Sequence, residues 1–339
     1  MPDSNLTVAV TGPTGTFGFG LMPLLQADER IAGIVGIARR PFDANEHGWT
    51  KMTYREGDVR DRAALQEAFQ GADVVVHLAF MITGAASRET IRKINVEGTL
   101  NAFRAAAAAG ARRFVYASSI AAYGFHRDNP VGMTEDWPAR PAAHLFYAQE
   151  KAEIERLLEE EAVGHAGLGV YLLRPPIVLG PHAVGGKDVV PEKLAPILRP
   201  LRGLMGRVSL PVVALPVPVQ FIHEADVGQA FLLCIVGAGA PGVYNITGDG
   251  VLSGAQLLRE LGLTPIPAPA RLVRAAARGV AAVPFAPPFT AWAEAFTHPA
   301  IMDSSKARRE LGWRPRYSSL EALRDTLHGR HDQSGKHLA

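Results

Sequence analysis

Glycine recurs at every third position directly after the first apolar run of the chain, in the segment Thr11-Gly-Pro-Thr-Gly-Thr-Phe-Gly18. The preceding run, Val8–Val10, is typical of a buried strand, and the leucines from Leu21 onward have a helical spacing. The three glycines permit a sharp turn, close approach of the backbone to a pyrophosphate and tight packing of a helix on a sheet. The segment therefore predicts the phosphate seat of a dinucleotide-binding fold, with a plain tight turn as the alternative.

Strand-like runs alternate with helical segments along the first half of the chain. The runs rich in β-branched and apolar residues are 7–11, 31–38, 52–54, 74–78, 113–117 and 169–173. Repeated βα units of this kind indicate parallel strands with helices on both faces. The pattern predicts an α/β fold with a Rossmann-type doubly wound parallel sheet, and 339 residues with 47% hydrophobic content allow a smaller second lobe.

A change of composition after Arg174 marks this second lobe. Prolines are frequent between 175 and 219, and a further strand is predicted at Val217–Ile222. We therefore assign residues 1–175 and 217–248 to the Rossmann domain. A smaller, discontinuous and mostly helical C-terminal substrate lobe is predicted to take residues 176–216 and 249–330, followed by a disordered tail at 331–339.

Two helices of the lobe are predicted at 304–311 and 319–327, each with a serine near its start as a cap. The segment 271–285 is either a packed lobe helix or a membrane-surface helix with three arginines on one face. The prolines that interrupt it favour the packed helix.

Composition and charge exclude several classes of partner. The net charge is +2 with both signs interspersed, so no basic face indicates nucleic acid. The chain has no run of about 18 apolar residues and no leader pattern, which predicts a cytoplasmic protein without a membrane partner. The single cysteine, Cys234, is predicted to be a buried thiol, and the histidines lack metal-ligand spacing, so no metal is expected.

The residues that end the second predicted strand indicate which dinucleotide binds. A carboxylate there accepts from the adenosine ribose 2′-OH of NAD, whereas an arginine pairs with the 2′-phosphate of NADP. Arg39 stands in this place, 21 residues after Gly18. It favours NADP through charge-assisted bonds of about 1.5–3 kcal/mol each. NAD is the alternative if Arg39 and Arg40 are only solvated charges.

Tyr147 and Lys151 are one helical turn apart and therefore share a helix face. A free phenol has a pKa of about 10, and a fixed neighbouring cation favours its phenolate form. We therefore expect Lys151 to lower the pKa of Tyr147 so that it exchanges protons near neutrality. Ser119 follows the predicted strand 113–117 on the ligand side, where its hydroxyl could hold a reacting oxygen.

The order of these segments resembles that of the extended short-chain dehydrogenase/reductase superfamily, which is labelled the NAD-dependent epimerase/dehydratase family. The matching segments are Thr11-Gly-x-x-Gly-x-x-Gly18, Asp58-Val59, His77-Leu-Ala79, Asn95-Val-Glu-Gly-Thr-Leu-Asn101, Ser118-Ser-x-x-x-Tyr-Gly124, Tyr147-x-x-x-Lys151, Arg174-Pro175 with Gly180-Pro181, Phe221-Ile-His-x-x-Asp-Val227 and Ser305-Lys-Ala-Arg-Arg-Glu-Leu-Gly-Trp313. They span almost the whole chain and specify the superfamily far better than the substrate. The resemblance also implies a homodimer.

The resemblance implies catalytic roles for four residues. Tyr147 is the general acid/base, and Lys151 lowers its pKa and holds the nicotinamide ribose. Ser119 binds the substrate oxygen, with Ser118 as a packing neighbour. Asn95 either supports the lysine and a water network or is ordinary helix polarity.

The resemblance implies a cofactor site along the same edge of the sheet. Asp58 accepts from the adenine amino group, caps a helix at Arg60–Gln70, or does both. His223 and Asp226 are read as turn and helix-start residues. The implied cofactor residues are Thr11, Gly12, Thr14, Gly15, Thr16, Phe17, Gly18, Arg39, Asp58, Val59, Leu78, Ala79, Tyr147, Lys151, Pro175 and Ile177.

The substrate is predicted from what the chain lacks and what lies near the reacting groups. Nucleotide-sugar members of the superfamily carry polar or arginine contacts to phosphate where this chain has Ile177, Val219 and the region of Ala293. The predicted pocket is instead largely apolar, with Phe80, Met81, Ser119, Ile120 and Phe146. We therefore predict NAD(P)-dependent hydride transfer to or from a fairly apolar carbonyl or secondary alcohol. A nucleotide-sugar epimerase or dehydratase is the first alternative, and a non-catalytic nucleotide-sensing protein is the second.

Overall fold

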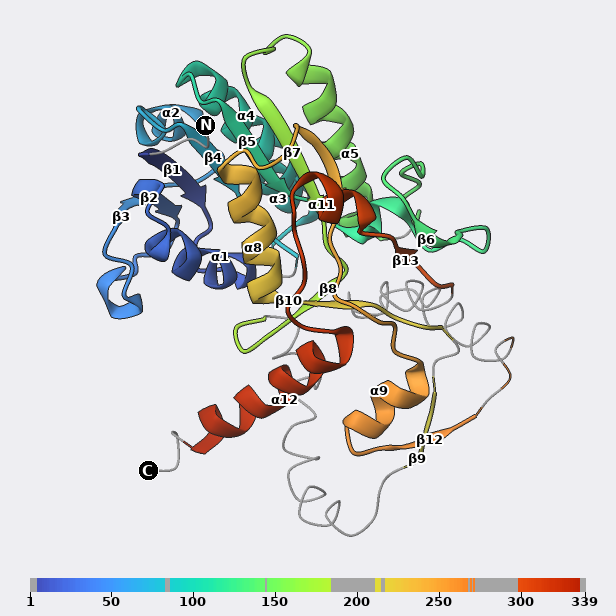
Figure 1. Ribbon diagram of the computed structural model, residues 1–339. Helices are drawn as coiled ribbons and strands as arrows, with labels where there is room; N and C mark the ends of the chain where they lie inside the picture. Colours follow the sequence, from blue (N-terminus) through green and yellow to red (C-terminus); the bar gives the residue numbers. More distant parts are fainter. Residues whose placement is uncertain are drawn as a thin grey trace.

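A seven-stranded sheet forms the centre of the computed structural model, which describes residues 5–82, 86–143, 145–183, 211–214, 217–267, 269, 271 and 298–335 (Figure 1). Its strands lie in the order β3-β2-β1-β4-β5-β7-β11, and all neighbours are parallel. This confirms the predicted Rossmann-type sheet. The strands are β1 Leu6–Thr11, β2 Ile31–Ala38, β3 Met52–Glu56, β4 Val74–His77, β5 Arg113–Ala117, β7 Gly169–Arg174 and β11 Gly242–Asn245.

Helices cover both faces of this sheet because side chains alternate along each strand. Val8 and Val10 of β1 pack with the core beneath α1, Thr16–Ala27, and α8, Glu224–Ile235. Ala9 between them packs on the other face. That face is covered by α2 Arg62–Ala68, α4 Gly98–Ala108 and α5 Phe146–Ala162, while α3 Arg88–Arg92 and a π-helical turn at Lys93–Glu97 lead into α4.

Two glycines let α1 and α8 cross at backbone contact. A Cβ at Gly20 would lie 2.1 Å from the Glu224 carbonyl oxygen, and one at Gly228 would lie 2.1 Å from the Gly20 oxygen. Neither position therefore tolerates a side chain without moving a helix. The crossing holds α1, which follows the glycine loop, against a second helix of the same layer.

Three two-stranded parallel sheets lie outside the large sheet in the described part of the chain. In Figure 1, α9, α12 and the β9–β12 pair lie away from the large sheet, with β8 and β10 between. The pairs are β8 Ile177–Leu179 with β10 Phe221–His223, β9 Pro211–Val213 with β12 Thr264–Ile266, and β6 Val131–Met133 with β13 Ile301–Met302. The remaining elements are the short η1 Asn45–His47 and η3 Ile120–Tyr123, and the helices α9 Gly254–Glu260, α11 Ser305–Glu310 and α12 Ser319–Gly335.

Two predicted elements after residue 210 differ from the structure. The strand expected at Val217–Ile222 is reduced to β10 and an isolated bridge from Val219 to Leu252. Pro218 has no N–H to donate to a ladder, and the last strand of the large sheet is β11 instead. The helix expected to end at 327 continues to Gly335 as α12, so the predicted disordered tail begins inside a helix.

The expected helix caps are also partly corrected. Ser304 precedes α11 but makes no side-chain capping bond. Asp61, not Asp58, caps α2, its side chain accepting from the Ala64 N–H, and the helix covers 62–68 instead of 60–70. Asp58 instead lies in the turn before the helix, where it accepts from the Arg60 N–H at 2.9 Å.

Part of the predicted substrate lobe packs into the Rossmann core. Ala307 and Leu311 at α11, and Trp313 after it, are buried in the cluster that lies against α1 and α8. Trp313 also donates its indole N–H to the Asp226 carbonyl oxygen at 3.0 Å. Residues 307–313 thus complete the core to which β1 and α1 also contribute.

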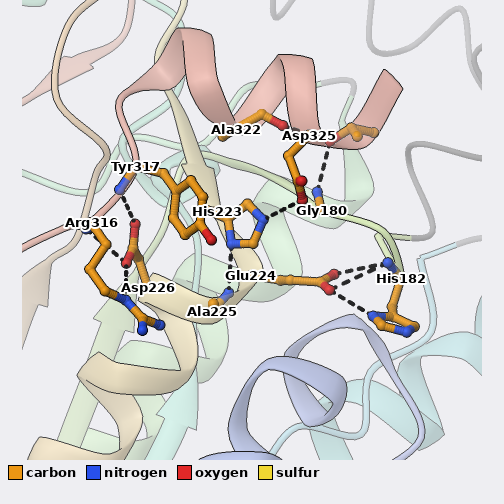
Figure 2. A network of polar contacts seen from close by, with 11 residues as sticks. Gly180, His182, His223, Glu224, Ala225, Asp226, Arg316, Tyr317, Ala322 and Asp325 are labelled. Atoms are coloured by element: carbon orange, nitrogen blue, oxygen red, sulfur yellow. Dashed lines mark hydrogen bonds and ion pairs between the residues drawn. The ribbon is translucent and has the colours of Figure 1, made fainter. Parts of the chain in front are cut away.

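Figure 2 shows the contacts that join the start of α8 to α12 and to the residues just before α12. The His223 ring accepts from the Ala225 N–H at 3.1 Å and bonds Asp325 at 3.0 Å. Asp226 accepts from the backbone N–H groups of Arg316 and Tyr317 at 2.9 and 3.0 Å. His223 and Asp226 are therefore turn and helix-start residues, as predicted.

Other predictions concern burial and excluded partners. Cys234 is buried, and burial raises the pKa of its thiol. Within the described residues, neither a helix able to cross a membrane nor a group of three potential metal ligands occurs. Most of the predicted insert at 176–216 and all of 271–285 except Arg271 lie outside the described residues.

Candidate active site

The glycine loop combines two positions that the fold itself requires with one that it does not. Gly12 has a φ of +71°, and a Cβ there would lie 3.0 Å from the Ala79 backbone. A Cβ at Gly18 would lie 1.9 Å from the Pro13 carbonyl oxygen. Gly15 is exposed, and a Cβ there would meet only the Gly12 oxygen, at 3.4 Å. Gly15 therefore leaves the backbone at the start of α1 open to the close approach of a ligand, as the predicted pyrophosphate site requires.

Thr11 and His77 join the glycine loop to the end of β4. The Ala79 N–H donates to Thr11 Oγ1 at 3.4 Å, and His77 lies between Thr11 and Thr99, with ring nitrogen to hydroxyl distances of 2.8 and 3.1 Å. Burial, with a smaller contribution from Lys151, lowers the pKa of His77 to about 3. His77 is therefore neutral near pH 7. Leu78 and Ala79, which are predicted to contact the cofactor, follow directly and lie beside the glycine loop.

The residues predicted to lie near the adenosine of the dinucleotide, together with their neighbour Arg60, are mostly charged, and two of them are exposed. Arg39 is exposed after β2, and Asp58 forms a two-bond pair with Arg60, at 3.0 Å to Nε and 2.7 Å to Nη2. The Arg60 hydrogen bonds, together with the charge of Arg39, hold the pKa of Asp58 below its usual value. Val59 is buried, and its carbonyl accepts from Asn101 at 3.2 Å. Three charges thus gather where the ribose and adenine are predicted to bind.

The predicted reacting groups lie on one buried face of α5. Tyr147 and Lys151 are 9% and 3% exposed. Lys151 Nζ donates to Tyr116 Oη at 3.1 Å and to the Ala117 carbonyl oxygen at 2.6 Å, both on β5. It also lies 3.7 Å from the centroid of the Phe80 ring, which packs edge-on against Tyr147 at 5.5 Å. The structure thus brings Phe80, Tyr147 and Lys151 together at the carboxyl edge of β4 and β5.

Burial dominates the pKa values of this pair. Burial raises the pKa of Tyr147, although a hydrogen bond with Ser119 opposes the rise. It lowers the pKa of Lys151 to about 7, against the opposing charges of Glu155 and Glu150. The expectation that Lys151 lowers the pKa of Tyr147 is therefore not met in this structure. A buried amine with a pKa of about 7 carries only part of a positive charge at neutrality.

Ser119 and Ser118 differ in their partners. Ser119 precedes η3, accepts from the Ala121 N–H at 3.2 Å and is 6% exposed. Its side chain interacts with that of Tyr147, and its role as the partner of the substrate oxygen stays a prediction. Ser118 does more than pack, because its hydroxyl donates to the buried carboxylate of Glu155.

Glu155 and Arg174 form a buried ion pair that the sequence analysis missed. Arg174 donates to Glu155 through Nε at 2.9 Å and Nη2 at 2.5 Å. The sequence did contain a signal, because Glu155 follows Tyr147 and Lys151 at successive intervals of four residues. That spacing puts all three on one helix face.

Asn95 contacts the lysine's neighbours, and no described contact joins it to Lys151 itself. Its side chain accepts from the Met81 N–H at 2.8 Å and donates to the Met81 carbonyl oxygen at 3.0 Å and to Glu150 at 2.7 Å. Asn95 is fully buried in the π-helical turn before α4. It therefore anchors the chain that follows Ala79 and fixes where Phe80 and Met81 lie.

The remaining predicted pocket and cofactor residues have their own neighbours in the fold. Ile120 is buried against Tyr123 and Met133, and its N–H donates to the Pro175 carbonyl oxygen at 2.9 Å. Phe146 is half-buried, with the Arg88 guanidinium 5.6 Å from its ring centre. Ile177 is 41% exposed. Phe17 packs on Phe231, while Thr14 is exposed and Thr16 is partly buried.

Comparison with known sequences agrees with this geometry. The family model for the NAD dependent epimerase/dehydratase family matches residues 8–247. Uncharacterized protein y4nG of Sinorhizobium fredii is 29% identical over 334 residues, which cover 94% of this chain and 77% of that protein. Sterol demethylase protein B of Methylococcus capsulatus is 32% identical over 180 residues, which cover 52% of each protein.

Solved structures support the same fold. The UDP-glucose 4-epimerase of Thermotoga maritima, determined with UDP-glucose, superposes with a TM-score of 0.73 over 97% of this chain and all of its own, at 20% identity. At this identity the likeness establishes the fold alone. Because the family model covers most of the chain, including the glycine loop, Ser119, Tyr147 and Lys151, the protein belongs to the NAD dependent epimerase/dehydratase family of enzymes.

Proposed function

We propose that this protein is an NADP-dependent oxidoreductase that interconverts a carbonyl and a secondary alcohol on a fairly apolar small molecule. The observation that carries the proposal is the cluster of buried Ser119, Tyr147 and Lys151 with half-buried Phe80. It combines a proton donor, a hydroxyl partner and a titratable amine with an aromatic wall. Such a cluster suits an uncharged reacting group, because an unpaired charge would be costly to bury there.

Each residue of the cluster has a distinct task in carbonyl reduction. A nicotinamide dinucleotide held by the glycine loop and Lys151 would supply the hydride. The phenol of Tyr147 donates the proton to the carbonyl oxygen. The raised pKa of Tyr147 keeps its hydroxyl protonated and able to donate. Ser119 donates a second hydrogen bond to the same oxygen, and the ammonium form of Lys151 stabilises the tyrosinate left behind.

The apolar substrate is supported by what lies near Tyr147. Phe80 contacts both catalytic side chains, and Asn95 fixes Met81 beside it. A relative that matches half of this chain is named for sterol demethylation. NADP is supported by Arg39, which is exposed and contributes to the charge around Asp58.

The test is a panel of ketones and secondary alcohols, with steroids included, monitored at the nicotinamide absorbance. We expect turnover with apolar members, with NADP preferred over NAD. Mass spectrometry of any co-purified ligand directs the choice of compounds. No turnover across the panel would contradict the proposal.

Nucleotide-sugar epimerisation is the second candidate, because the family model that matches residues 8–247 describes epimerases and dehydratases. In such a reaction the hydride leaves and returns to the same cofactor, so no net change in nicotinamide absorbance occurs. A large rise in melting temperature with UDP-sugars would favour this candidate over the first.

A further inference from the structure

Glu155 is a buried carboxylate that neither the family motif nor the proposed proton transfer uses. It lies on α5, on the same face as Tyr147 and Lys151, and its side chain is 4% exposed. Acidic side chains are almost never buried to this degree unless they are paired. Because Glu155 lies one helical turn beyond Lys151, its contacts bear on the geometry of the candidate active site.

Two partners hold the Glu155 carboxylate. Arg174, at the end of β7, binds both oxygens, at 2.9 and 2.5 Å, and Ser118, just after β5, donates to Oε1. The Arg174 guanidinium in turn lies 4.4 Å from the ring centre of Tyr123. Three elements of the fold therefore meet at a single carboxylate.

The residues on either side of Ser119 in the sequence are held by hydrogen bonds. The Ser118 N–H donates to the Leu173 carbonyl oxygen at 2.8 Å, and the Ile120 N–H donates to that of Pro175 at 2.9 Å. The segment that carries Ser119 is thus bonded to the end of β7 on both sides. Glu155 ties both pieces to α5, which carries Tyr147, so the placement of Ser119 relative to Tyr147 depends on this carboxylate.

Glu155 also supplies negative charge near Lys151. The titratable groups that face Lys151 are His77 from β4, Tyr116 from β5, and Tyr147, Glu150 and Glu155 from α5. Glu155 is the stronger of the two carboxylates that oppose the fall in the pKa of Lys151. Glu155 itself faces Arg174, Ser118, Tyr116 and, on its own helix, Glu159.

We propose that Glu155 is a positioning residue of the active site, which aligns Ser119 with Tyr147 through Ser118 and Arg174 and places a negative charge one helical turn from Lys151. The inference rests on the roles proposed for Ser119, Tyr147 and Lys151. Its central test does not require the substrate.

That test is an NMR titration of the lysine ¹³Cε signals, with Lys151→Met used to assign the Lys151 signal. In Glu155→Gln the anion is lost while Arg174 stays charged, so the midpoint of Lys151 should move about one unit to lower pH. The double variant Glu155→Met/Arg174→Met removes both charges, and apolar replacement of a whole buried pair is often tolerated. This double variant should fold even if Glu155→Gln does not. The titration midpoint of Lys151 in it should also move to lower pH, but by less than in Glu155→Gln.

Kinetics then test the alignment of Ser119. Ser118→Ala leaves Ser119, Tyr147 and Lys151 intact, and it should lower kcat about tenfold without changing the dinucleotide Kd. A double variant that folds with the wild-type Lys151 midpoint, together with a wild-type kcat for Ser118→Ala, would overturn the proposal and leave a purely structural ion pair. Absence of any turnover in the wild type would contradict the proposed function instead, and the NMR titration would still decide the role of Glu155.

Discussion

Different physical effects dominate at the two ends of the candidate site. At the end predicted to bind the phosphates and the adenosine, the main features are the constrained backbone at Gly12 and Gly18 and the exposed charge of Arg39. At the reacting end, Tyr147 and Lys151 are almost completely buried, and burial shifts both pKa values. One end is governed by space and exposed charge, and the other by desolvation.

This difference predicts how each end responds to mutation. Exposed charges interact through solvent and can be exchanged at little cost in stability. Buried groups lose water on folding, so each depends on its partners for both its protonation and its position. Changes at the adenosine end should therefore alter which dinucleotide binds, whereas changes at the reacting end should alter turnover and the dependence of stability on pH.

The largest effect is expected at the buried end. Tyr147→Phe removes the proton donor and should lower kcat about 10²–10⁴-fold, the usual contribution of general acid/base catalysis. Dinucleotide affinity should fall far less than kcat, because the other predicted cofactor residues, from the glycine loop to Lys151, are untouched. Turnover at the nicotinamide absorbance and dinucleotide Kd measure the two quantities. A variant with wild-type kcat would remove Tyr147 from the proposed mechanism.

Two matched glycine variants separate packing from ligand binding in the loop. Gly18→Ala puts a Cβ 1.9 Å from the Pro13 oxygen and should cost about 1–3 kcal/mol of stability and abolish dinucleotide binding. Gly15→Ala meets only the Gly12 oxygen at 3.4 Å, so its melting temperature should stay near the wild type while dinucleotide Kd rises. Wild-type affinity in Gly15→Ala would mean that the pyrophosphate does not approach there.

Arg39→Asp tests the exposed end. It should shift the ratio of kcat/KM for NADP to that for NAD by about 10–100-fold toward NAD, the worth of one charge-assisted bond of about 1.5–3 kcal/mol. Arg40→Asp, the neighbouring exposed arginine, is the control and should shift it far less. A wild-type enzyme that already prefers NAD would refute the assignment of Arg39.

The smallest effect expected is a change of stability with pH that originates at the buried end. Folding lowers the pKa of His77 to about 3, mainly through burial, whereas in the unfolded chain it is about 6.5. Between these values the unfolded chain binds a proton that the folded state does not. The contribution of His77 is therefore complete above about pH 6.5 and is lost as the pH falls toward 3.

Urea unfolding at about pH 5 and about pH 7.5 measures this contribution. His77→Gln should reduce the difference in unfolding free energy between the two conditions. His328→Gln, at an exposed position on α12, should leave it unchanged. An equal response in both variants would show that burial at the reacting end does not produce the difference.

Local pattern was sufficient for much of the fold. The strands predicted at 31–38 and 113–117 coincide with β2 and β5, because their apolar runs are long and end clearly at turn residues. The prediction at Val217–Ile222 was wrong because strand identity there depends on pairing with β8 and Leu252, which are distant in the sequence. β11 was not predicted, since its sequence Gly-Val-Tyr-Asn lacks the continuous apolar run that marks β4, a strand of the same length.

The candidate site divides in the same way. Helix periodicity was enough to place Tyr147 and Lys151 on one face, and the glycine spacing was enough to predict the loop. The contacts of Asn95 with Met81 and Glu150, and of Glu155 with Arg174 and Ser118, join residues up to 55 positions apart. Because such pairs are formed by tertiary packing, no local pattern identifies their partners.

The sequence by itself determined six strands of the large sheet, the glycine loop and which side chains are candidates for the reaction, because each of these depends on residues that are close along the chain. Only the tertiary structure decided the protonation of those side chains. Lys151 has a pKa of about 7 and Tyr147 a raised one because β4, β5 and Phe80 close over them. Desolvation depends on everything that surrounds a group, so it exists only once the chain has folded.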